Sequence, residues 1–402
     1  MKSSGKALAF VLITILVDAM GIGIIVPVIP SLLMELVGKG LSSVAVYNGW
    51  LMMLFAGLQF VSAPILGNLA DCYGRRPVLL VSLAAYGMDL IIMGVAPTIG
   101  WLFIGRAMSG VFSATVVVAS AYISDVTTDA ERARGFGWMG AAFGIGFVVG
   151  PAIGGLLGEY NNRLPFFVAA GFAMANVIFG YFVLPETLDP ADRREFSLRR
   201  AHVVGALRRM FGYPVVRGLL LALVFFNVAQ DANLATWTFV TMEKFGWTAF
   251  DIGMSMTFIG VCMAIFQGFA VGPAVKWLGD NRAVIVGFVM FVASFFGFAF
   301  ATAGWQMYAW TVIFAMGSIS GPAMTAILSK RLPINEQGEL QGALTAMRSI
   351  TACFGPVTMT WLFSYFSSPV APIQFAGAPF FVAAVLTTAG LLVIFRTLRQ
   401  KA

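Results

Sequence analysis

Three charged side chains stand inside long apolar runs in the first half of the sequence. Asp18 and Asp89 each lie eleven positions into a run, and Arg106 lies six positions into another. Because an ionisable side chain in hydrocarbon is costly, each is a candidate functional residue. Desolvation favours the neutral form of an acid and a nearby arginine favours its ionised form, so such an acid can take up and release a proton. The pattern predicts a proton-exchange site in which Asp89 carries the proton and Asp18 contacts a small molecule; the alternative is an Asp–Arg pair that only holds helices together.

The second half of the sequence has two charged residues inside apolar runs, Asp231 and Arg348. Arg348 lies eight positions into its run, deep enough to face a cavity. It either pairs with Asp231 or binds an anionic group of a small molecule, and the sequence leaves both alternatives open. Other polar or aromatic residues in apolar runs are candidates for lining a cavity, although each is also explained as a helix-to-helix contact: they are Gln59, Asn227, Gln230, Asn233, Trp237 and Gln267.

The composition indicates that these residues belong to a membrane protein. The chain of 402 residues is 59% hydrophobic and 11% charged, with a mean hydropathy of +0.88. Apolar runs long enough to cross about 30 Å of hydrocarbon as helices recur twelve times, and their continuous apolar character excludes a β-barrel. We therefore predict an all-α integral membrane fold with twelve transmembrane helices at residues 7–34, 47–69, 78–96, 100–125, 135–158, 165–184, 215–239, 250–277, 284–303, 305–329, 340–366 and 377–396.

The basic residues predict the orientation of these helices. Of the 25 Lys and Arg residues, the outer loops hold only Lys39, Arg163 and Lys244, while Arg106 and Arg348 lie within helices. The remainder falls on one side, which the positive-inside rule makes the cytoplasmic side, so both termini are predicted to be cytoplasmic. The net charge of +7 then reflects topology beside anionic lipid. We expect no nucleic-acid partner.

Motifs recur in the two halves of the sequence at an offset of 205 residues. Gly150-Pro151 matches Gly355-Pro356, and two glycines of the loop after the second helix have counterparts at the same offset. Such a recurrence indicates a duplicated unit, and parallel repeats of this kind frame a site at mid-membrane. We predict two six-helix bundles in a pseudo-twofold repeat and a cytoplasmic linker with an amphipathic helix near residues 201–212. The predicted boundaries are 1–184 for the first bundle, 185–213 for the linker and 214–402 for the second bundle.

The stretch "GNLADCYGRRP", residues 67–77, places charges and turn-forming residues between two apolar runs. Gly67 permits a close approach of helices, Gly74 permits a tight turn, and Asp71 can cap a helix or pair with arginine. As a bare pattern this is a short positive-inside loop. It resembles the signature loop of the major facilitator superfamily, which implies a clamp that holds the two halves in an outward-open state. The gating residues are Gly67, Asp71, Gly74, Arg75 and Arg76, with Asp125 as the acidic partner.

Segments over nearly the whole chain are similar to the tetracycline/proton antiporters of this superfamily. They include "LVDAMGIGIIVPVIPSLL" (16–33), "YGMDLIIM" (86–93) and "LQGALTAMRSITACFGP" (340–356). The resemblance implies a proton-coupled secondary transporter that exports small amphipathic compounds by alternating access, a drug efflux antiporter of antibiotic resistance in the bacterial inner membrane. We further expect a monomer with no cofactor other than the proton and no metal site. The element that resembles the exporter marker is Gly150, Pro151, Gly154 and Gly155.

The alternative within the same superfamily is a transporter of a metabolite or an organic anion, which Arg348 favours slightly. An enzyme is not indicated, because the single histidine, His202, lies in the linker and Ile319 stands where "GSISG" would need a serine.

The resemblance to the tetracycline antiporters breaks at two positions. Those proteins carry a histidine in the eighth helix and an aspartate in the ninth, and by position these fall at Met263 and Phe291. Because neither side chain can bind a proton or a metal ion, we expect weak or no resistance to tetracycline.

Overall fold

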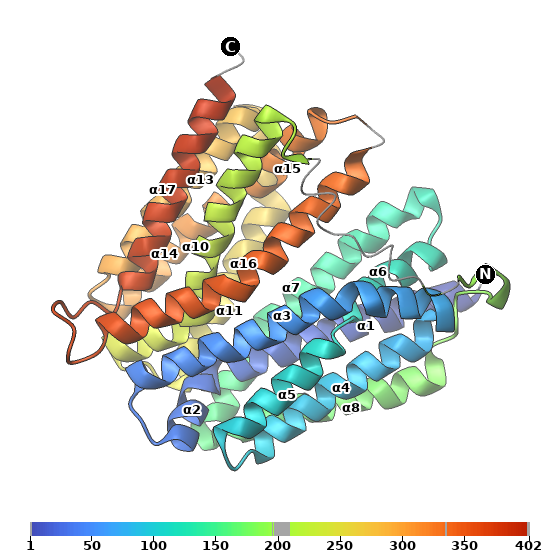
Figure 1. The fold of residues 1–402 in the computed structure, drawn as a ribbon, viewed down its shortest axis with the longest axis horizontal. Helices are drawn as coiled ribbons and strands as arrows, with labels where there is room; N and C mark the ends of the chain where they lie inside the picture. The colour runs from blue at the N-terminus through green and yellow to red at the C-terminus, as the bar shows by residue number, and fades with distance from the viewer. Residues whose placement is uncertain (1, 195, 197–209, 334–335, 400–402) are drawn as a thin grey trace. The chain divides into compact units, whose positions relative to one another are not determined.

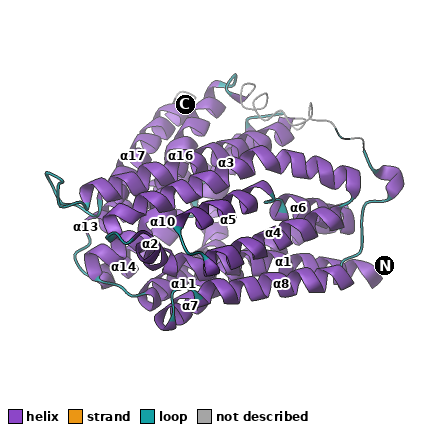
Figure 2. Ribbon diagram, turned by 60° about the horizontal axis from the view of Figure 1, so that its bottom comes forward, coloured by secondary structure: helices purple, strands orange, loops and turns teal. Residues whose placement is uncertain are grey.

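The computed structural model describes residues 2–194, 196, 210–333 and 336–399, and every regular element in this part of the chain is a helix (Figure 2). The predicted all-α fold is therefore confirmed. The amphipathic helix predicted near residues 201–212 lies outside the described residues except for 210–212, and His202 also lies outside them.

Each predicted membrane run contains one helix or two consecutive helices (Figure 1). Eleven helical spans among the described residues are long and apolar enough to cross a membrane, and α16, with 30 residues, is as long but more polar and makes the twelfth. The chain is thus a multi-pass membrane protein. The helices are α1 (Lys2–Ile25), α2 (Ile29–Val37), α3 (Leu41–Tyr73), α4 (Arg75–Val95), α5 (Ile99–Val111), α6 (Thr115–Val126), α7 (Asp129–Tyr160), α8 (Leu164–Val183), α10 (Pro214–Phe245), α11 (Ala249–Ile265), α12 (Val271–Leu278), α13 (Asp280–Phe300), α14 (Gly304–Gly317), α15 (Ser320–Lys330), α16 (Gln337–Phe366) and α17 (Ala378–Arg399), with 3-10 turns η1 (Val26–Val28) and η2 (Pro190–Asp192) and a π-helical turn η4 (Phe266–Ala270).

A glycine with positive φ precedes both α4 and α13. Gly74 (φ 108°) comes directly before Arg75, and Gly279 (φ 73°) comes directly before Asp280, 205 residues further on. Residues with a side chain rarely adopt such a conformation, so glycine suits both turns. The recurrence of the same turn at the offset found in the sequence supports an internal repeat of the backbone.

Four predicted helices are interrupted in the structure. The run 250–277 changes to the π-helical turn η4 between α11 and α12. The run 100–125 is broken between α5 and α6, and the run 305–329 is broken between α14 and α15. These breaks also recur 205 residues apart, since α6 begins at Thr115 and α15 at Ser320. The first run changes to the 3-10 turn η1 at Pro27, which lacks a backbone donor. Hydropathy does not reveal these breaks, because the sequence stays apolar on both sides of each.

By their contacts, the described residues divide into two compact units. Most of each predicted repeat falls in one unit, but a short segment of one helix from each repeat packs with the other unit. The first unit comprises Met1–Gly38, Leu54–Ala201 and Thr248–Gly260, and the second comprises Lys39–Met53, His202–Trp247 and Val261–Ala402.

In the first unit, α1 packs along α7 and α8, and α4 packs along α8 and α5. The contact of α1 with α7 is close, because a side chain added at Gly146, Gly150 or Gly154 of α7 would overlap the backbone of α1. Small residues at such spacing let two helix backbones approach in a membrane, where apolar burial alone gives little drive. Apolar side chains that include Phe10 and Tyr122 form the core of this unit.

In the second unit, α10 packs along α17 and α16, and α13 packs along α17 and α14 (Figure 1). Aromatic rings fill the space among α10, α13 and α14. The ring of Phe226 lies 5.2 Å from that of Phe288 and 4.7 Å from that of Phe291, and Phe314 lies 5.0 Å from Phe291, measured between centroids. This aromatic cluster joins the three helices.

Each Gly-Pro element receives a glycine from another helix of its unit. In the first unit, Gly253 of α11 lies against Pro151 of α7. In the second unit, Gly49 of α3 lies against the backbone of α16 at Pro356, and the neighbouring Asn48 donates a hydrogen bond to the Ala235 carbonyl at 3.2 Å. The two elements therefore serve as matching contact points in the two units.

Candidate functional site

Asp89 and Arg106 form an ion pair inside the first unit. The Asp89 side chain on α4 is fully buried, and its Oδ2 atom lies 2.5 Å from Nη2 of Arg106 on α5. Gly105 allows this approach, because an added Cβ would lie 2.5 Å from Asp89 Oδ1. The guanidinium also lies 5.7 Å from the centroid of the Phe55 ring. Of the two acids that the sequence placed within reach of Arg106, the structure pairs it with Asp89.

Asp18 on α1 has a different environment. It is partly exposed, and the Thr115 side chain at the start of α6 lies within hydrogen-bonding reach of its carboxylate. The break between α5 and α6 brings Thr115 to this position. The Tyr86 hydroxyl lies against Gly21 of α1. It is close enough to Asp18, Asp89 and Arg106 for electrostatic interaction with their charges. Tyr86 was missed in the sequence, although it stands three residues before Asp89 and therefore on the same helix face.

Asp231 on α10 is the buried acid of the second unit. Its side chain is 8% exposed, and within the described residues its Oδ2 atom has no hydrogen-bond partner. Gly355 of α16 lies directly against the carboxyl group. Arg348 is exposed and stands two helical turns before Gly355 on the same helix. In the part of the chain that the structure describes, Asp231 and Arg348 do not form an ion pair.

Three further cavity candidates lie near Asp231 on α10. Asn227 precedes it by four residues and shares its helix face, whereas Gln230 and Asn233 lie on neighbouring faces. All three are half-buried. The Asn233 Oδ1 atom is buried without a partner among the described residues, so this part of α10 has unused hydrogen-bonding capacity.

The remaining cavity candidates have different local environments. Gln59 donates a hydrogen bond to the Ser113 hydroxyl at 2.7 Å in the first unit. Gln267 is exposed in the π-helical turn η4. Trp237 is 3% exposed and packs edge-on against Phe298 at 5.2 Å, as a core residue of the second unit.

The two positions at which the sequence departs from the tetracycline antiporters differ in burial. Phe291 is 2% exposed and belongs to the aromatic cluster of the second unit. Met263 on α11 is half-buried. An acid at position 291 would stand among phenyl rings.

The signature loop between α3 and α4 is a network of charges within the first unit. Arg75 pairs with Asp71 on α3 and, through Nε at 3.4 Å, with Asp125 on α6. Arg76 donates to the Tyr181 carbonyl on α8. A side chain at Gly67 would make only an ordinary contact, so the close approach expected there is not required. The predicted pairing of Asp71 and Asp125 with the loop arginines is present.

Glu186, which the sequence reasoning missed, holds this loop in place. Its carboxylate accepts hydrogen bonds from the backbone amides of Arg75 at 2.8 Å and Arg76 at 3.1 Å, the first two residues of α4. A negative charge at this position accepts hydrogen bonds from backbone amides that have no partner within the helix. It also interacts favourably with the positive end of the helix dipole. Gly74 leaves room for it, because an added Cβ would overlap the carboxylate. The pattern "LPETL" after the sixth predicted helix was the available signal, but it does not reveal a partner about 110 residues away.

The exporter-like element lies in α7. Gly150 and Gly154 face the backbone of α1, and Gly155 faces α11. Pro151 stands inside the helix and packs on Gly23 of α1. The element thus joins three helices of the first unit through backbone contacts.

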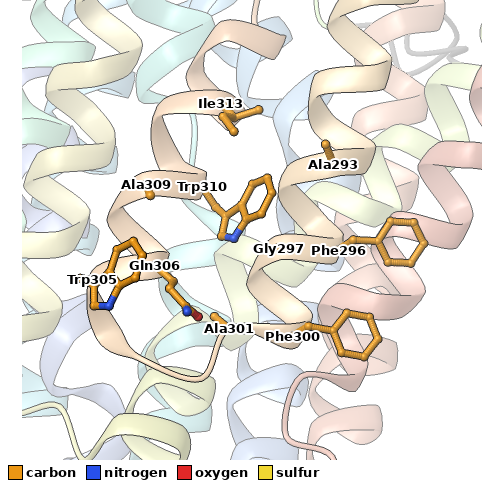
Figure 3. A pocket seen from close by; sticks show the side chains of 10 residues that line it. All are labelled: Ala293, Phe296, Gly297, Phe300, Ala301, Trp305, Gln306, Ala309, Trp310 and Ile313. Atoms are coloured by element: carbon orange, nitrogen blue, oxygen red, sulfur yellow. The ribbon is translucent and has the colours of Figure 1, made fainter.

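A separate pocket of about 680 Å³ lies between α13 and α14 (Figure 3). The Trp310 ring lies over Gly297, where a side chain would overlap it, and Phe300 and Trp305 are exposed at the edge. Its lining is apolar except for Gln306, whose carbonyl accepts a hydrogen bond from the Thr302 amide at 2.7 Å. None of the predicted site residues lines this pocket.

Repeated membrane helices with charged residues inside them are the arrangement of a secondary transporter. The sequence matches the Major Facilitator Superfamily over residues 11–318 and, in an overlapping second match, over residues 235–402. The chain belongs to this superfamily and is a transporter, not an enzyme.

Two relatives and one solved structure show which members of the superfamily this chain is similar to. The tetracycline resistance protein, class C, of Escherichia coli is 38% identical over 361 residues, 90% of each chain. Multidrug resistance protein 1 of Bacillus subtilis (strain 168) is 30% identical over 366 residues, 90% of this chain and 91% of the relative. The crystal structure of a bacterial homologue of the human lysosomal transporter Spinster, 13% identical, covers 99% of this chain and 97% of its own with a TM-score of 0.81, which shows the shared fold. The predicted resemblance to the tetracycline antiporters is confirmed.

Proposed function

We propose that this protein exports small amphipathic compounds from the bacterial cell in exchange for protons. Relatives named for resistance to tetracycline and to multiple drugs support export as the activity. In this proposal the repeats 1–184 and 214–402, joined by the linker 185–213, give the cargo alternating access to the two sides of the inner membrane. Both termini lie in the cytoplasm. The protein acts as a monomer, with the proton as the only cofactor and without nucleic acid or metal.

The ion pair between Asp89 and Arg106 is the observation that carries the proposal. A proton on Asp89 removes the negative charge that holds Arg106, so uptake and release of a proton switch the pair between a joined and a separated arrangement. A charged pair inside a membrane span is costly, which favours a functional role over a purely structural one. Because Asp89 is fully buried, a proton can reach its side chain but a bulky cargo cannot.

Asp18 is the better contact for cargo. It is partly exposed, and among the described residues it forms no ion pair. Tyr86 lies within electrostatic range of both acids and of Arg106, and its buried hydroxyl has no hydrogen-bond partner among the described residues. A change in the charge of Asp89 therefore alters the surroundings of Asp18, which couples the proton to the cargo.

Transport in proteoliposomes tests this assignment, with ethidium as a fluorescent amphipathic cargo. Asparagine keeps the shape of aspartate but cannot ionise. The variant Asp89→Asn is expected to bind ethidium yet lose transport driven by a pH gradient, with exchange at equal pH less affected. Glu35→Gln is the matched control, since Glu35 pairs with Arg163 at 2.9 Å in a partly exposed ion pair that includes none of Asp18, Asp89 and Arg106. Proton-driven transport that survives in Asp18→Asn, in Asp89→Asn and in the double variant would refute the proposal.

A further inference from the structure

The pocket between α13 and α14 lies where these two helices reach the membrane surface. α13 ends at Phe300 and α14 begins at Gly304, and residues on both sides of this turn line the pocket (Figure 3). Both helices belong to spans that are long and apolar enough to cross a membrane. Trp305, in the first turn of α14, is 69% exposed, and tryptophan is enriched at the membrane–water interface. The pocket therefore begins at the depth where acyl chains join the headgroups, which is the outer leaflet in the orientation proposed above.

The walls of the pocket are apolar and held in place by neighbouring rings. Phe296 and Phe300 of α13 pack edge-on against Phe381 of α17, with centroids 5.8 Å and 6.0 Å apart. Trp310 covers Gly297, where an added side chain would overlap it. In the described part of the chain, no charged side chain lines the pocket. Because an unpaired charge in such surroundings is costly, the group that fills the pocket must be uncharged.

Two N–H donors of α14 stand in this apolar lining without a partner. The Gln306 Oε1 atom accepts hydrogen bonds from the amides of Thr302 at 2.7 Å and Ala303 at 3.4 Å, which turns the amide oxygen toward the start of α14. The Gln306 Nε2 and Trp310 Nε1 atoms make no hydrogen bond among the described residues. Gln306 and Trp310 lie about one turn apart on the same helix face, and both side chains extend toward α13 (Figure 3). The pocket thus offers two donors to an uncharged acceptor.

The acyl ester of a phospholipid has the chemistry that this pocket requires. Its hydrocarbon chain is uncharged, and its carbonyl oxygen is an acceptor that lies at the membrane surface. The pocket volume of about 680 Å³ is within the range of small-molecule sites. An acyl chain gains little apolar burial on leaving the bilayer, because lipid is as apolar as the lining. Its retention must therefore depend on the shape of the pocket and on the two donors.

We propose that the pocket between α13 and α14 is a binding site for one acyl chain of a membrane phospholipid, whose ester carbonyl accepts hydrogen bonds from Trp310 and Gln306. The chain extends from Ala301 toward Ala293, roughly 12 Å along α13. This inference goes beyond the proposed export function and does not depend on it, since its measurement is lipid contact and not transport.

Photolabelling in proteoliposomes tests this site. The probes are two phosphatidylcholines with the same diazirine-bearing chain, joined to glycerol through an ester in one and through an ether in the other. The ether lipid keeps the chain and the headgroup but lacks the carbonyl acceptor. After illumination and proteolysis, mass spectrometry measures the label on α13 and α14. The ester lipid is expected to label the lining residues at least about threefold more than the ether lipid, the average effect of a hydrogen bond in a membrane.

Trp310→Phe keeps an aromatic ring over Gly297 and removes the indole N–H. It is expected to lower labelling by the ester lipid about threefold and to leave labelling by the ether lipid unchanged. Unchanged labelling by the ether lipid also shows that the variant keeps the shape of the pocket. Trp361→Phe on α16 is the matched control, because Trp361 is exposed and does not line the pocket.

Ala293→Leu fills the inner end of the pocket and is expected to lower labelling by both lipids. Val289→Leu is its control, since Val289 is exposed about one turn earlier on α13 and does not line the pocket. Equal labelling of the wild-type protein by the two lipids, or unchanged labelling in Ala293→Leu, would overturn the proposal. Equal labelling that the neutral compound triphenylphosphine oxide abolishes would indicate a small-molecule site instead, and would overturn it as well.

Discussion

Removal of the Glu186 carboxylate is expected to loosen the signature loop. Glu186 accepts hydrogen bonds from four backbone amides: Arg75 (2.8 Å), Arg76 (3.1 Å), Thr187 (3.0 Å) and Leu188 (3.1 Å). The first two amides open α4, and the last two begin the segment that follows α8. Glu186→Ala therefore frees the start of α4 and the start of the linker in one step.

The magnitude follows from these contacts. Loss of an N-terminal cap costs about 1 kcal/mol, and loss of a negative charge at a helix start costs about 0.3–1 kcal/mol. Water replaces the linker contacts of this half-buried group, so the total is about 2 kcal/mol. Glu186→Gln keeps one acceptor oxygen and is expected to lose about half of that amount. Asp189→Ala is the matched control, because Asp189 bonds only the Ala191 amide at 2.9 Å and is exposed.

Two measurements report the effect. Thermal unfolding in detergent is expected to shift downward by about 2 °C for Glu186→Ala. The second is alkylation of Cys72, whose Sγ donates to the Arg194 carbonyl of the linker at 2.8 Å, whereas Cys262 and Cys353 are buried. Release of the linker is expected to raise the reaction rate of Cys72. Wild-type unfolding and a wild-type alkylation rate in Glu186→Ala would refute this account of the loop.

Two further outcomes are expected. Asp71→Asn and Arg75→Ala should lose most transport while cargo binding persists, because Arg75 pairs with Asp71 and Asp125 and not with Asp18 or Asp89. Wild-type transport rates in both variants, measured in proteoliposomes, would contradict a gating role. Phe291→Asp should unfold at a lower temperature than Phe291→Leu, because it puts a carboxylate among aromatic rings at a cost of about 3–5 kcal/mol. It should not gain tetracycline transport, because position 263 remains methionine. Equal unfolding temperatures of the two variants would mean that water reaches this position.

Hydropathy and the 205-residue offset were sufficient to predict the spans and their repetition, because both depend on properties that extend over a whole helix. The break at Thr115 was not predictable in this way. It leaves hydropathy unchanged, yet it brings Thr115 to Asp18. The pairing of Arg106 was predicted only as a choice between two acids, because helical spacing gives depth in the membrane but not the rotation of each helix.

Glu186 and Tyr86 were missed for a related physical reason. Their roles depend on contacts with distant segments: Glu186 meets α4 across about 110 residues, and Tyr86 meets α1 at Gly21. A glutamate after a helix is ordinary in solvent, and a tyrosine in an apolar run is ordinary in a core. Only the positive φ of Gly74 and its lack of a side chain make the glutamate contact possible.

The two repeats have the same backbone turns but different charged side chains at equivalent positions, and this difference bears on how the protein works. At the offset of 205 residues, Asp89 corresponds to Ser294 and Arg106 to Thr311. Both hydroxyl groups are buried and bond to carbonyls of their own helices, at 2.7 Å and 2.8 Å. At the positions where the first repeat has an ion pair that protonation can break, the second repeat has hydroxyl groups that bond within their own helices. Among the described residues, the buried charge pair that a proton could open lies in the first repeat, whereas the buried Asp231 of the second repeat has an oxygen atom without a hydrogen-bond partner.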